Sequence, residues 1–406
     1  MADLLEHLAV TPHASDGAAA WAASGAMALT GRRDGSPLLA AASAAPLMAA
    51  LAKRFGALTA ELESPVELDG PALLGERAAI AGHSRQGDVS CGGACRLLRA
   101  TDGWIALSLP RDDDRALLPA WLERDVRTDQ DLTEGVAARS SAVLVERAAL
   151  LGLPCGALGE VREPKLPALL LAEGDRVTSL SSLTVVDLSS LWAGPLCAQL
   201  LAEAGAQVIK VESTRRPDGA RLGPADFYDL LHSGTKSVVL DFTSPEGRAA
   251  LAELIARADV VIEASRPRAL EQLGIDARAG GARVWLSITG YGREQAARVG
   301  FGDDAAVAGG LVAWDANGPV FAADAAADPA AGLLAAVAVL DRLRAGGRWL
   351  VDVSLAGAAA LLASSGRDDS GWDGPVAAPR ARPPRGRAPR LGEHTDEVLA
   401  SLRLRF

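Results

Sequence analysis

One segment near the middle of the chain constrains the fold most, because it runs through a strand, a turn, a helix and a second strand. Residues 184–188 and 207–211 are short runs of apolar and β-branched side chains, which predict buried strands. Residues 193–195 (Ala-Gly-Pro) form a turn whose proline suits the start of a helix. Residues 196–204 are apolar on almost every side, as in a helix packed on a parallel sheet, and Gly205 ends them. The segment is therefore a βαβ unit, which predicts an α/β fold.

The length and charge of the chain disfavour several classes of protein. With 406 residues, the chain has room for two or more domains and a large core. Its net charge of -10 disfavours a nucleic-acid partner, because no basic face would balance the charge of the phosphates. Charged residues or glycines interrupt every apolar stretch, and residues 1–20 lack a basic start followed by an apolar core. We therefore expect a cytoplasmic protein with neither a nucleic acid nor a membrane as partner.

The four cysteines do not have the spacing of a metal site. Cys91 and Cys95 do not form a CxxC pair, and neither a second pair nor a histidine cluster accompanies them. Cys155 and Cys197 are isolated in the sequence. We predict four buried, reduced thiols and no metal.

Further motifs continue the βαβ unit in a fixed order. The ordered set resembles the family III CoA-transferases, a family of carnitine, bile-acid and formyl-CoA transferases that also contains 2-methylacyl-CoA racemases. The matching phrases are Val-Asp-Leu at 186–188, Ala-Gly-Pro at 193–195, Gly-Ala-Gln-Val-Ile-Lys-Val-Glu at 205–212, Gly-Thr-Lys-Ser-Val-Val-Leu-Asp at 234–241, Ser-Pro-Glu-Gly-Arg at 244–248, Ala-Asp-Val-Val-Ile-Glu at 258–263, Arg-Pro at 266–267, Leu-Ser-Ile-Thr-Gly-Tyr-Gly at 286–292 and Leu-Gly-Glu-His-Thr at 391–395.

The resemblance implies an α/β fold with a Rossmann-like CoA-binding large domain and a smaller α+β domain. In an ordinary member the βαβ region comes first, whereas here phrases similar to the small domain precede it, so we predict a rearranged order. The predicted units are a helical segment at 1–55 that resembles the family's catalytic-helix region, a small domain at 56–175, the CoA-binding domain with the catalytic aspartate at 176–365, a flexible linker at 366–388 and a C-terminal helix at 389–406.

An internal repeat supports this rearrangement. Residues 24–31 and 43–50 align with residues 309–314 and 329–336, which indicates a partial duplication. Alternatively, runs of Ala and Gly align by chance, and residues 1–175 form a separate domain of unknown role. In the duplication hypothesis, the first copy has Ala42 where the second copy has Asp328.

The resemblance implies that Asp328 is the nucleophile. In the family this residue is an aspartate just before a helix, in the pattern Asp-x-x-x-Gly-Leu-x-Ala, and Asp328, Gly332 and Leu333 fit that spacing. A carboxylate can attack a thioester to give a mixed anhydride and then an aspartyl-CoA thioester. The alternative is that Asp328 only caps the helix, with Pro329 in the first turn. Asp324 is a second candidate, although its spacing from Gly332 does not fit.

The predicted contacts to CoA lie at the start of the βαβ helix or in loops before and after strands, where a nucleotide can bind in open α/β sheets. The basic ones are alternatively ordinary solvated charges. The candidates are Trp192, Ala193, Arg215, Lys236, Arg266, Gly290 and Tyr291. The chain lacks a Gly-x-Gly-x-x-Gly phrase, so NAD is not expected. The resemblance implies no permanent cofactor, with acyl-CoA and a carboxylic acid as substrates.

The resulting hypothesis is a CoA-transferase that moves CoA from an acyl-CoA to a carboxylic acid through an aspartyl-CoA thioester. One alternative is a non-catalytic CoA-binding or scaffold subunit, because residues 264–267 lack the amide of the family's Asn-Phe-Arg-Pro phrase. Another is a 2-methylacyl-CoA racemase, which the presence of Phe301 at the family's histidine position disfavours. We expect His232 to be a turn residue and His394 to start the C-terminal helix. The resemblance implies a homodimer, or a pair with a paralogue.

Overall fold

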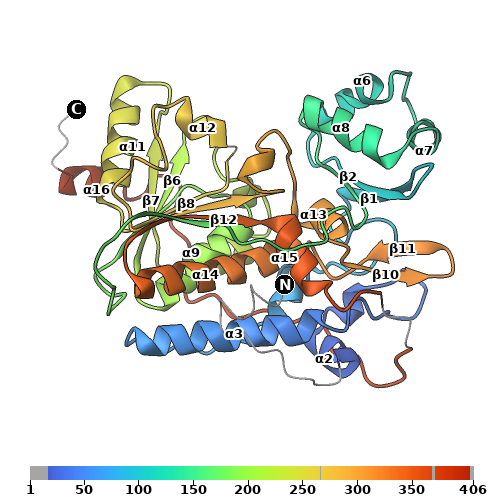
Figure 1. Ribbon diagram of the computed structural model, residues 1–406, viewed down its shortest axis with the longest axis horizontal. Helices are drawn as coiled ribbons and strands as arrows, with labels where there is room; N and C mark the ends of the chain where they lie inside the picture. Colours follow the sequence, from blue (N-terminus) through green and yellow to red (C-terminus); the bar gives the residue numbers. More distant parts are fainter. Residues whose placement is uncertain (1–16, 266, 368–370, 403–406) are drawn as a thin grey trace.

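The computed structural model describes residues 17–265, 267–367 and 371–402. Its larger lobe is built on a seven-stranded sheet with the strand order β4-β12-β9-β8-β5-β6-β7 (Figure 1). Six strands are parallel, and β4 pairs with β12 in the antiparallel direction at one edge. The strands are β4 (Ala168–Ala172), β5 (Thr184–Asp187), β6 (Gln207–Ser213), β7 (Lys236–Leu240), β8 (Val260–Glu263), β9 (Val284–Thr289) and β12 (Arg348–Ser354).

Helices cover both faces of this sheet, which explains why its central strands are apolar at consecutive positions. Val185 and Val260 pack into the core that contains α9 (Ala193–Glu203) and α14 (Ala327–Ala345). Their neighbours Val186 and Val261 pack on the opposite face. That face is covered by α11 (Pro245–Arg257) and α16 (Thr395–Ser401), near α12 (Pro267–Glu271). The predicted βαβ unit is confirmed as β5, α9 and β6, although α9 begins earlier than expected.

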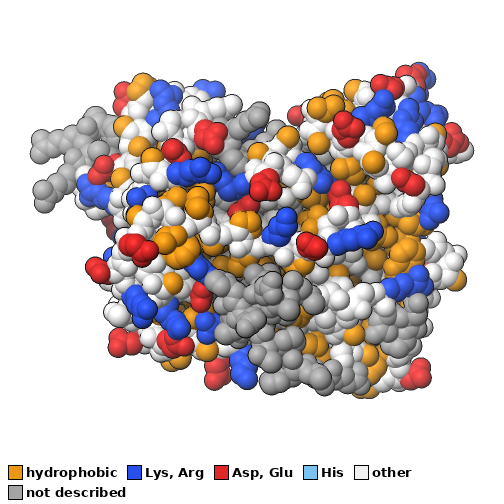
Figure 2. Space-filling model, in the orientation of Figure 1, with side chains coloured by type: hydrophobic (Ala, Val, Ile, Leu, Met, Phe, Trp, Pro, Cys, Tyr) orange, Lys and Arg blue, Asp and Glu red, His pale blue; other side chains and the backbone are white. Residues whose placement is uncertain are grey.

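A smaller α+β lobe stands apart from the sheet, and a notch separates the two lobes in the space-filling view (Figure 2). It has a three-stranded antiparallel sheet whose helices pack around buried Trp121 and Leu144. Its elements are β1 (Cys95–Arg99), β2 (Trp104–Ser108), α5 (Asp112–Ala116), α6 (Leu118–Leu122), α7 (Asp129–Ala137), α8 (Ser141–Leu151) and β3 (Cys155–Ala157).

Helix α13 and the β-hairpin that follows it contact the small sheet. The hairpin formed by β10 and β11 packs against the small sheet through Val312 and Phe321, which share a core with Cys95. The remaining short elements are η3 (Gly219–Leu222), α10 (Ala225–His232), η4 (Arg293–Gln295), α13 (Gly302–Ala308), β10 (Val312–Asp315), β11 (Gly318–Phe321) and α15 (Leu355–Leu362).

The N-terminal helices belong with the large lobe. They are α2 (Gly17–Ser24), η1 (Met27–Leu29), α3 (Ala44–Glu61), η2 (Pro71–Gly75) and α4 (Glu76–Ala81). Helix α3 lies beside α14 (Figure 1), and ion pairs of 3.2 Å between Arg54 and Asp341 and of 2.7 Å between Glu61 and Arg344 join them.

The structure differs from the predicted domain boundaries at two points. Helix α3 continues past the boundary placed at residue 55. Strand β4 lies before the boundary placed at residue 175, yet it belongs to the large sheet. Its partner β12 lies far away in the sequence, so no local pattern could place it.

The linker predicted as flexible at 366–388 follows a fixed path over its second half. Ala377 donates a backbone hydrogen bond of 2.9 Å to Ala22. The Arg382 guanidinium lies 2.7 Å from the buried Glu76 carboxylate and 3.0 Å from the Gln199 side chain. Arg382, which lies in the predicted linker, therefore joins α4 to α9.

All four cysteines are buried, and none of them is in a disulfide. Across the three ranges that the structure describes, no helix combines the length and the apolar character needed to cross a membrane.

Candidate active site

A cavity of about 290 Å³ lies where α4, α9, α10, α13 and α14 converge. Its wall combines carboxylates and cations with a larger apolar surface. The residues that line it are Arg77, Ala81, His83, Ala94, Ser108, Pro110, Leu191, Trp192, Ala220, Gly223, Pro224, Phe227, Phe301, Gly302, Asp303, Ala325 and Asp328.

Asp328 lines this cavity from the second position of α14. The N-cap of the helix is Ala326, so the alternative that Asp328 only caps the helix does not hold. Its carboxylate faces α13, because a Cβ added at Gly302 would lie 2.3 Å from Asp328 Oδ2. The side chain is therefore free of the capping role and half-buried at the cavity wall.

The spacing between Asp328 and Gly332 has a packing reason. A Cβ added at Gly332 would lie 2.7 Å from the carbonyl oxygen of Ala193, at the start of α9. Glycine lets the two helices approach closely here, and this contact positions the first turn of α14 beside the start of α9. The Asp-x-x-x-Gly pattern therefore places a carboxylate next to the residue that begins the βαβ helix.

The carboxylates around the cavity have different pKa values because their partners differ. The pKa of Asp328 is raised to about 7, mainly by burial. The neighbouring Asp303 and Asp324 contribute to this rise, and Arg77 opposes it. Burial raises the pKa of Asp303 to about 6. Burial would also raise the pKa of Asp324, but the Arg77 guanidinium lowers it to about 2. At neutral pH, Asp324 is ionised, whereas Asp328 exchanges between protonated and ionised forms.

Arg77 and His83 are held by Asp324. Arg77 donates from Nε and Nη2 to the two Asp324 oxygens at 2.9 Å and 2.5 Å. His83 Nδ1 lies 3.5 Å from Asp324 Oδ2. Asp324 is fully buried and committed to the Arg77 guanidinium, which disfavours it as an alternative nucleophile.

A second carboxylate, Asp304, joins α13 to the small lobe. Ser108 of β2 donates a hydrogen bond of 2.7 Å to Asp304, and the Tyr291 hydroxyl lies 3.4 Å from it. Burial raises the pKa of Asp304 to about 7. These contacts hold the start of α13, and hence Phe301 and Asp303, against the small lobe.

The predicted CoA contacts are divided between this cavity and other places. Trp192 lines the cavity, and Ala193 starts α9 directly after it. Arg215 is exposed in the turn after β6. Lys236 starts β7 and lies 2.8 Å from Glu397, in a separate groove.

The remaining predicted contacts follow other strands. Gly290 and Tyr291 come directly after β9, and the buried Tyr291 hydroxyl donates to the Cys155 carbonyl oxygen at 3.3 Å. Arg266 lies outside the described residues. His394 is the N-cap of α16, as expected, and His232 is a buried residue at the end of α10 instead of a turn residue.

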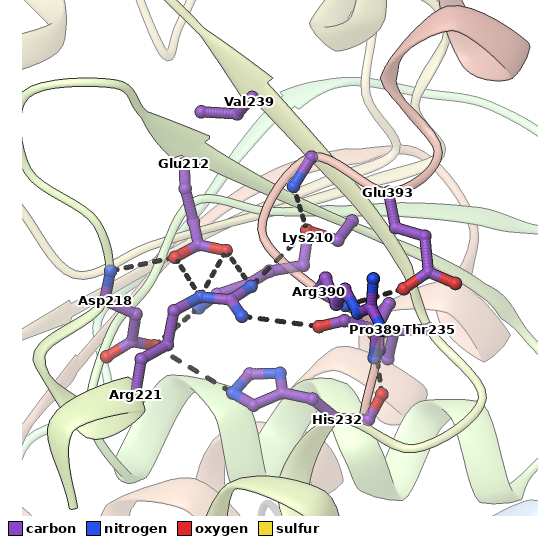
Figure 3. A network of polar contacts seen from close by, with 12 residues as sticks. Lys210, Glu212, Asp218, Arg221, His232, Thr235, Val239, Pro389, Arg390 and Glu393 are labelled. Carbon is purple, nitrogen blue, oxygen red and sulfur yellow. Dashed lines mark hydrogen bonds and ion pairs between the residues drawn. The ribbon is translucent and has the colours of Figure 1, made fainter. Parts of the chain in front are cut away.

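A buried charge network supports the loop that carries Trp192 (Figure 3). Lys210 lies 3.0 Å from Asp218 and 3.4 Å from Asp187. Burial would lower the pKa of Lys210, but these carboxylates raise it above its ordinary value. Asp218 accepts a hydrogen bond of 3.0 Å from the backbone of Leu191, which has a positive φ of 70°. The network therefore fixes an unusual backbone conformation directly before Trp192.

The same network holds Arg221 and His232. The Arg221 guanidinium lies 2.6 Å from Glu212 and 4.5 Å from the centre of the Tyr228 ring, as Figure 3 shows for the pair with Glu212. His232 lies 3.9 Å from Asp218, and burial lowers its pKa well below the ordinary value. His232 is therefore neutral at pH 7 and faces away from the solvent.

Sequence reasoning missed four residues of the cavity. Arg77 and His83 come from α4 and the turn after it, and no motif marked that segment. Phe227 lies on α10, in another segment that no motif marked. Asp303 had a usable signal, since it directly follows the phrase that contains Phe301.

The fold and the cavity define a class of α/β protein with a half-buried carboxylate at the start of a core helix, beside the first βα turn of the sheet. The chain belongs to CoA-transferase family III, whose sequence model matches residues 180–389. The family and the fold class predicted from the sequence motifs are therefore confirmed. The matched segment contains Asp328, Trp192 and Phe301, but neither Arg77 nor His83.

Similar proteins include several CoA-transferases. The chain is 32% identical over 205 residues to an acyl-CoA transferase of Fusarium pseudograminearum, which is 44% of this chain and 45% of the relative. It is 32% identical over 206 residues to the succinyl-CoA–D-citramalate CoA-transferase of Chloroflexus aurantiacus, 46% of this chain and 51% of that one. A solved CAIB/BAIF family protein from Brucella suis has 30% identity and a TM-score of 0.43, over 46% of this chain and 55% of that chain. The chain thus matches about half the length of these proteins.

Proposed function

We propose that this protein transfers CoA from an acyl-CoA to a carboxylic acid, with Asp328 as the covalent nucleophile. The observation that carries the proposal is the position of the Asp328 carboxylate. It lies in the first turn of α14, at the wall of a cavity, and the cap position is occupied by Ala326 instead. Family membership supports the reaction class, and the position of Asp328 at the cavity wall supports the choice of residue.

The first half of the proposed reaction forms an aspartyl-CoA thioester. The Asp328 carboxylate attacks the thioester carbonyl carbon, the carbon–sulfur bond breaks, and CoA thiolate leaves an acyl-aspartyl anhydride. The thiolate then attacks the aspartyl carbonyl carbon of the anhydride. The donor acid leaves as a carboxylate and carries away one oxygen that belonged to Asp328.

The second half reverses these steps with another acid. The acceptor carboxylate attacks the aspartyl-CoA carbonyl carbon and expels the thiolate, which forms a new anhydride. The thiolate attacks the acceptor's carbonyl carbon, giving the new acyl-CoA and a free Asp328 carboxylate. Electrons and protons balance, since one carboxylate and one thioester enter and leave.

Two features around Asp328 support this chemistry. The raised pKa makes its carboxylate a stronger nucleophile than an ordinary aspartate, while a useful fraction stays ionised at neutral pH. The Trp192 Nε1–H is buried and has no hydrogen-bond partner among the described residues. It is available to donate to an oxygen of the bound thioester as negative charge develops there.

A second candidate is exchange of the α-proton of an acyl-CoA, and His83 favours it. Phe301 occupies the histidine position of the family's racemases, but the structure brings another imidazole into the same cavity. Incubation with an acyl-CoA in deuterium oxide tests this candidate. Deuterium at the α-carbon that disappears in His83→Ala would establish proton exchange, and its absence in wild-type protein would exclude it.

Hydroxylamine trapping tests the main proposal. The protein is incubated with acyl-CoAs and hydroxylamine, and the peptide that contains Asp328 is examined by mass spectrometry. We expect a hydroxamate on Asp328 in wild-type protein and none on the matched peptide of Asp328→Ala. Asp341→Asn is the control, because it changes another carboxylate of α14 that pairs with Arg54 outside the cavity. Tight CoA binding without any hydroxamate would instead support the non-catalytic subunit.

A further inference from the structure

We infer that the cavity selects a nonpolar monocarboxylic acyl group and rejects dicarboxylic acyl groups, because the guanidinium that lines it is already neutralised by Asp324. This inference rests on the proposed function, whose substrate class it names. Three observations carry it: the apolar wall, the cavity volume and the pairing of the charges.

The wall of the cavity is mainly apolar and aromatic. Its apolar residues include Ala81, Ala94, Pro110, Trp192, Phe227 and Phe301. The Trp192 and Phe227 rings meet edge to face, with centroids 5.3 Å apart and planes at 87°. This arrangement is typical of a fixed aromatic pair, so the wall presents rigid hydrocarbon to the acyl group.

The volume of the cavity suits an acyl group and not a whole CoA molecule. An apolar cavity of about 150 Å³ accommodates benzene. The cavity here is about 290 Å³, which leaves room for an aromatic ring or a branched chain together with the thioester carbonyl. CoA itself would extend out of the cavity.

The charges of the cavity leave no cation for a second carboxylate of the substrate. Arg77 and His83 are the basic side chains among the described residues that line the cavity, and both face Asp324. The face of the Arg77 guanidinium is also covered, since it stacks over the Trp192 ring at 5.2 Å.

A dicarboxylic acyl group would therefore meet an unfavourable site. Its distal carboxylate would have to displace Asp324 from Arg77 or remain buried without a cation. It would also lie beside Asp303 and Asp328, which are acidic themselves. Like charges at short distance strengthen this rejection.

A matched pair of thioesters tests the inference. Succinyl-CoA and 4-methylpentanoyl-CoA have acyl groups of the same shape, but one ends in a carboxylate and the other in two methyl groups. We measure the rate of hydroxamate formation on Asp328 at subsaturating thioester. We expect 4-methylpentanoyl-CoA to react roughly 100-fold faster, as for a site that leaves a buried charge unpaired. Equal rates, or faster reaction with succinyl-CoA, would overturn the inference.

Two variants test the role of the Arg77–Asp324 pair. Asp324→Asn keeps the shape of the side chain and releases the charge of Arg77, so the preference should fall by about tenfold or more. Leu191→Arg adds a cation at the cavity wall without touching that pair, and the preference should change in the same direction. Asp341→Asn, which leaves the cavity unchanged, should keep the wild-type ratio. A wild-type ratio in both cavity variants would contradict the proposed cause.

Failure of the proposed function gives a different result from failure of the inference. If neither thioester labels Asp328, the proposed function fails. Calorimetric dissociation constants of the two thioesters on wild-type protein then still test the selectivity. Weaker binding of succinyl-CoA supports the inference, and equal binding contradicts it.

Discussion

The Arg77 guanidinium donates to both carboxylate oxygens of Asp324, at 2.9 Å and 2.5 Å, across 247 residues of sequence. This pair joins the N-terminal helix α4 to the segment just before α14. Residues 180–389 match the family model, so one partner of the pair lies outside the matched segment. The N-terminal helices therefore complete the cavity that the family segment begins.

Removal of Arg77 should destabilise the protein strongly. The substitution Arg77→Gln leaves the fully buried Asp324 without its charged partner, and we expect a loss of about 3–5 kcal/mol in the free energy of unfolding. Urea denaturation measures it. Arg96→Gln is the control, because it breaks an exposed ion pair with Asp129 that contributes at most about 1 kcal/mol. Equal losses in the two variants would contradict a structural role for the Arg77 pair.

The rate of covalent labelling should rise with pH through about 7, because the nucleophile is the ionised form of Asp328, whose pKa burial raises to about 7. Asp303 titrates nearby with a pKa of about 6, so the observed midpoint belongs to the pair and not to one residue. Single-turnover labelling between about pH 5 and about pH 9 measures this profile. A labelling rate that stays constant over this range, as expected for a carboxyl with the ordinary pKa of about 3.9, would contradict the raised pKa.

Asp328→Asn should stabilise the protein at alkaline pH. A raised pKa means that folding favours the protonated carboxyl, so ionisation opposes folding. This cost begins above the ordinary value of about 3.9 and is complete above the folded value of about 7. We expect the variant to be up to about 4 kcal/mol more stable at high pH, because each unit of pKa shift corresponds to about 1.4 kcal/mol, with no difference below the ordinary value. Thermal unfolding of both proteins at low and at high pH measures this difference. A difference in stability between variant and wild type that does not change with pH would contradict the prediction.

Gly332→Ala should lower both stability and labelling of Asp328. The added Cβ would lie 2.7 Å from the Ala193 carbonyl oxygen, so α9 and α14 must separate. We expect a loss of about 1–3 kcal/mol by denaturant unfolding and a larger relative loss of labelling rate. Gly103→Ala is the control, since nothing lies within 4 Å of a Cβ at that position. Wild-type labelling in Gly332→Ala would show that the close approach does not position the nucleophile.

The sheet and the position of Asp328 could be predicted because they depend on local patterns. Consecutive valines at 185 and 186 face opposite helical layers, and this two-sided burial produces the apolar run seen in the sequence. The Asp-x-x-x-Gly spacing reflects the contact between α14 and α9 at Gly332. Such signals lie within a few residues of the elements that they specify.

The rest of the candidate site depends on tertiary contacts that no local pattern encodes. Arg77 and His83 come near Asp324 only when the N-terminal helices pack against the large lobe. Lys236 was predicted to contact CoA because it lies in a loop just before a strand. It starts β7 and pairs with Glu397 in another groove. Strand starts lie at the edge of a parallel sheet opposite the carboxyl ends, where ligands bind.

Isotope transfer into Asp328 tests the central claim most directly. An acceptor acid labelled with ¹⁸O in both carboxylate positions is supplied with an unlabelled acyl-CoA, and the Asp328 peptide is weighed after turnover. Because the acceptor attacks the aspartyl carbonyl carbon, one acceptor oxygen should remain on Asp328 and raise the peptide mass by about 2 Da after the first turnover, approaching about 4 Da as later turnovers replace the second oxygen. Formation of the new acyl-CoA without ¹⁸O in Asp328 would contradict the covalent route through this residue.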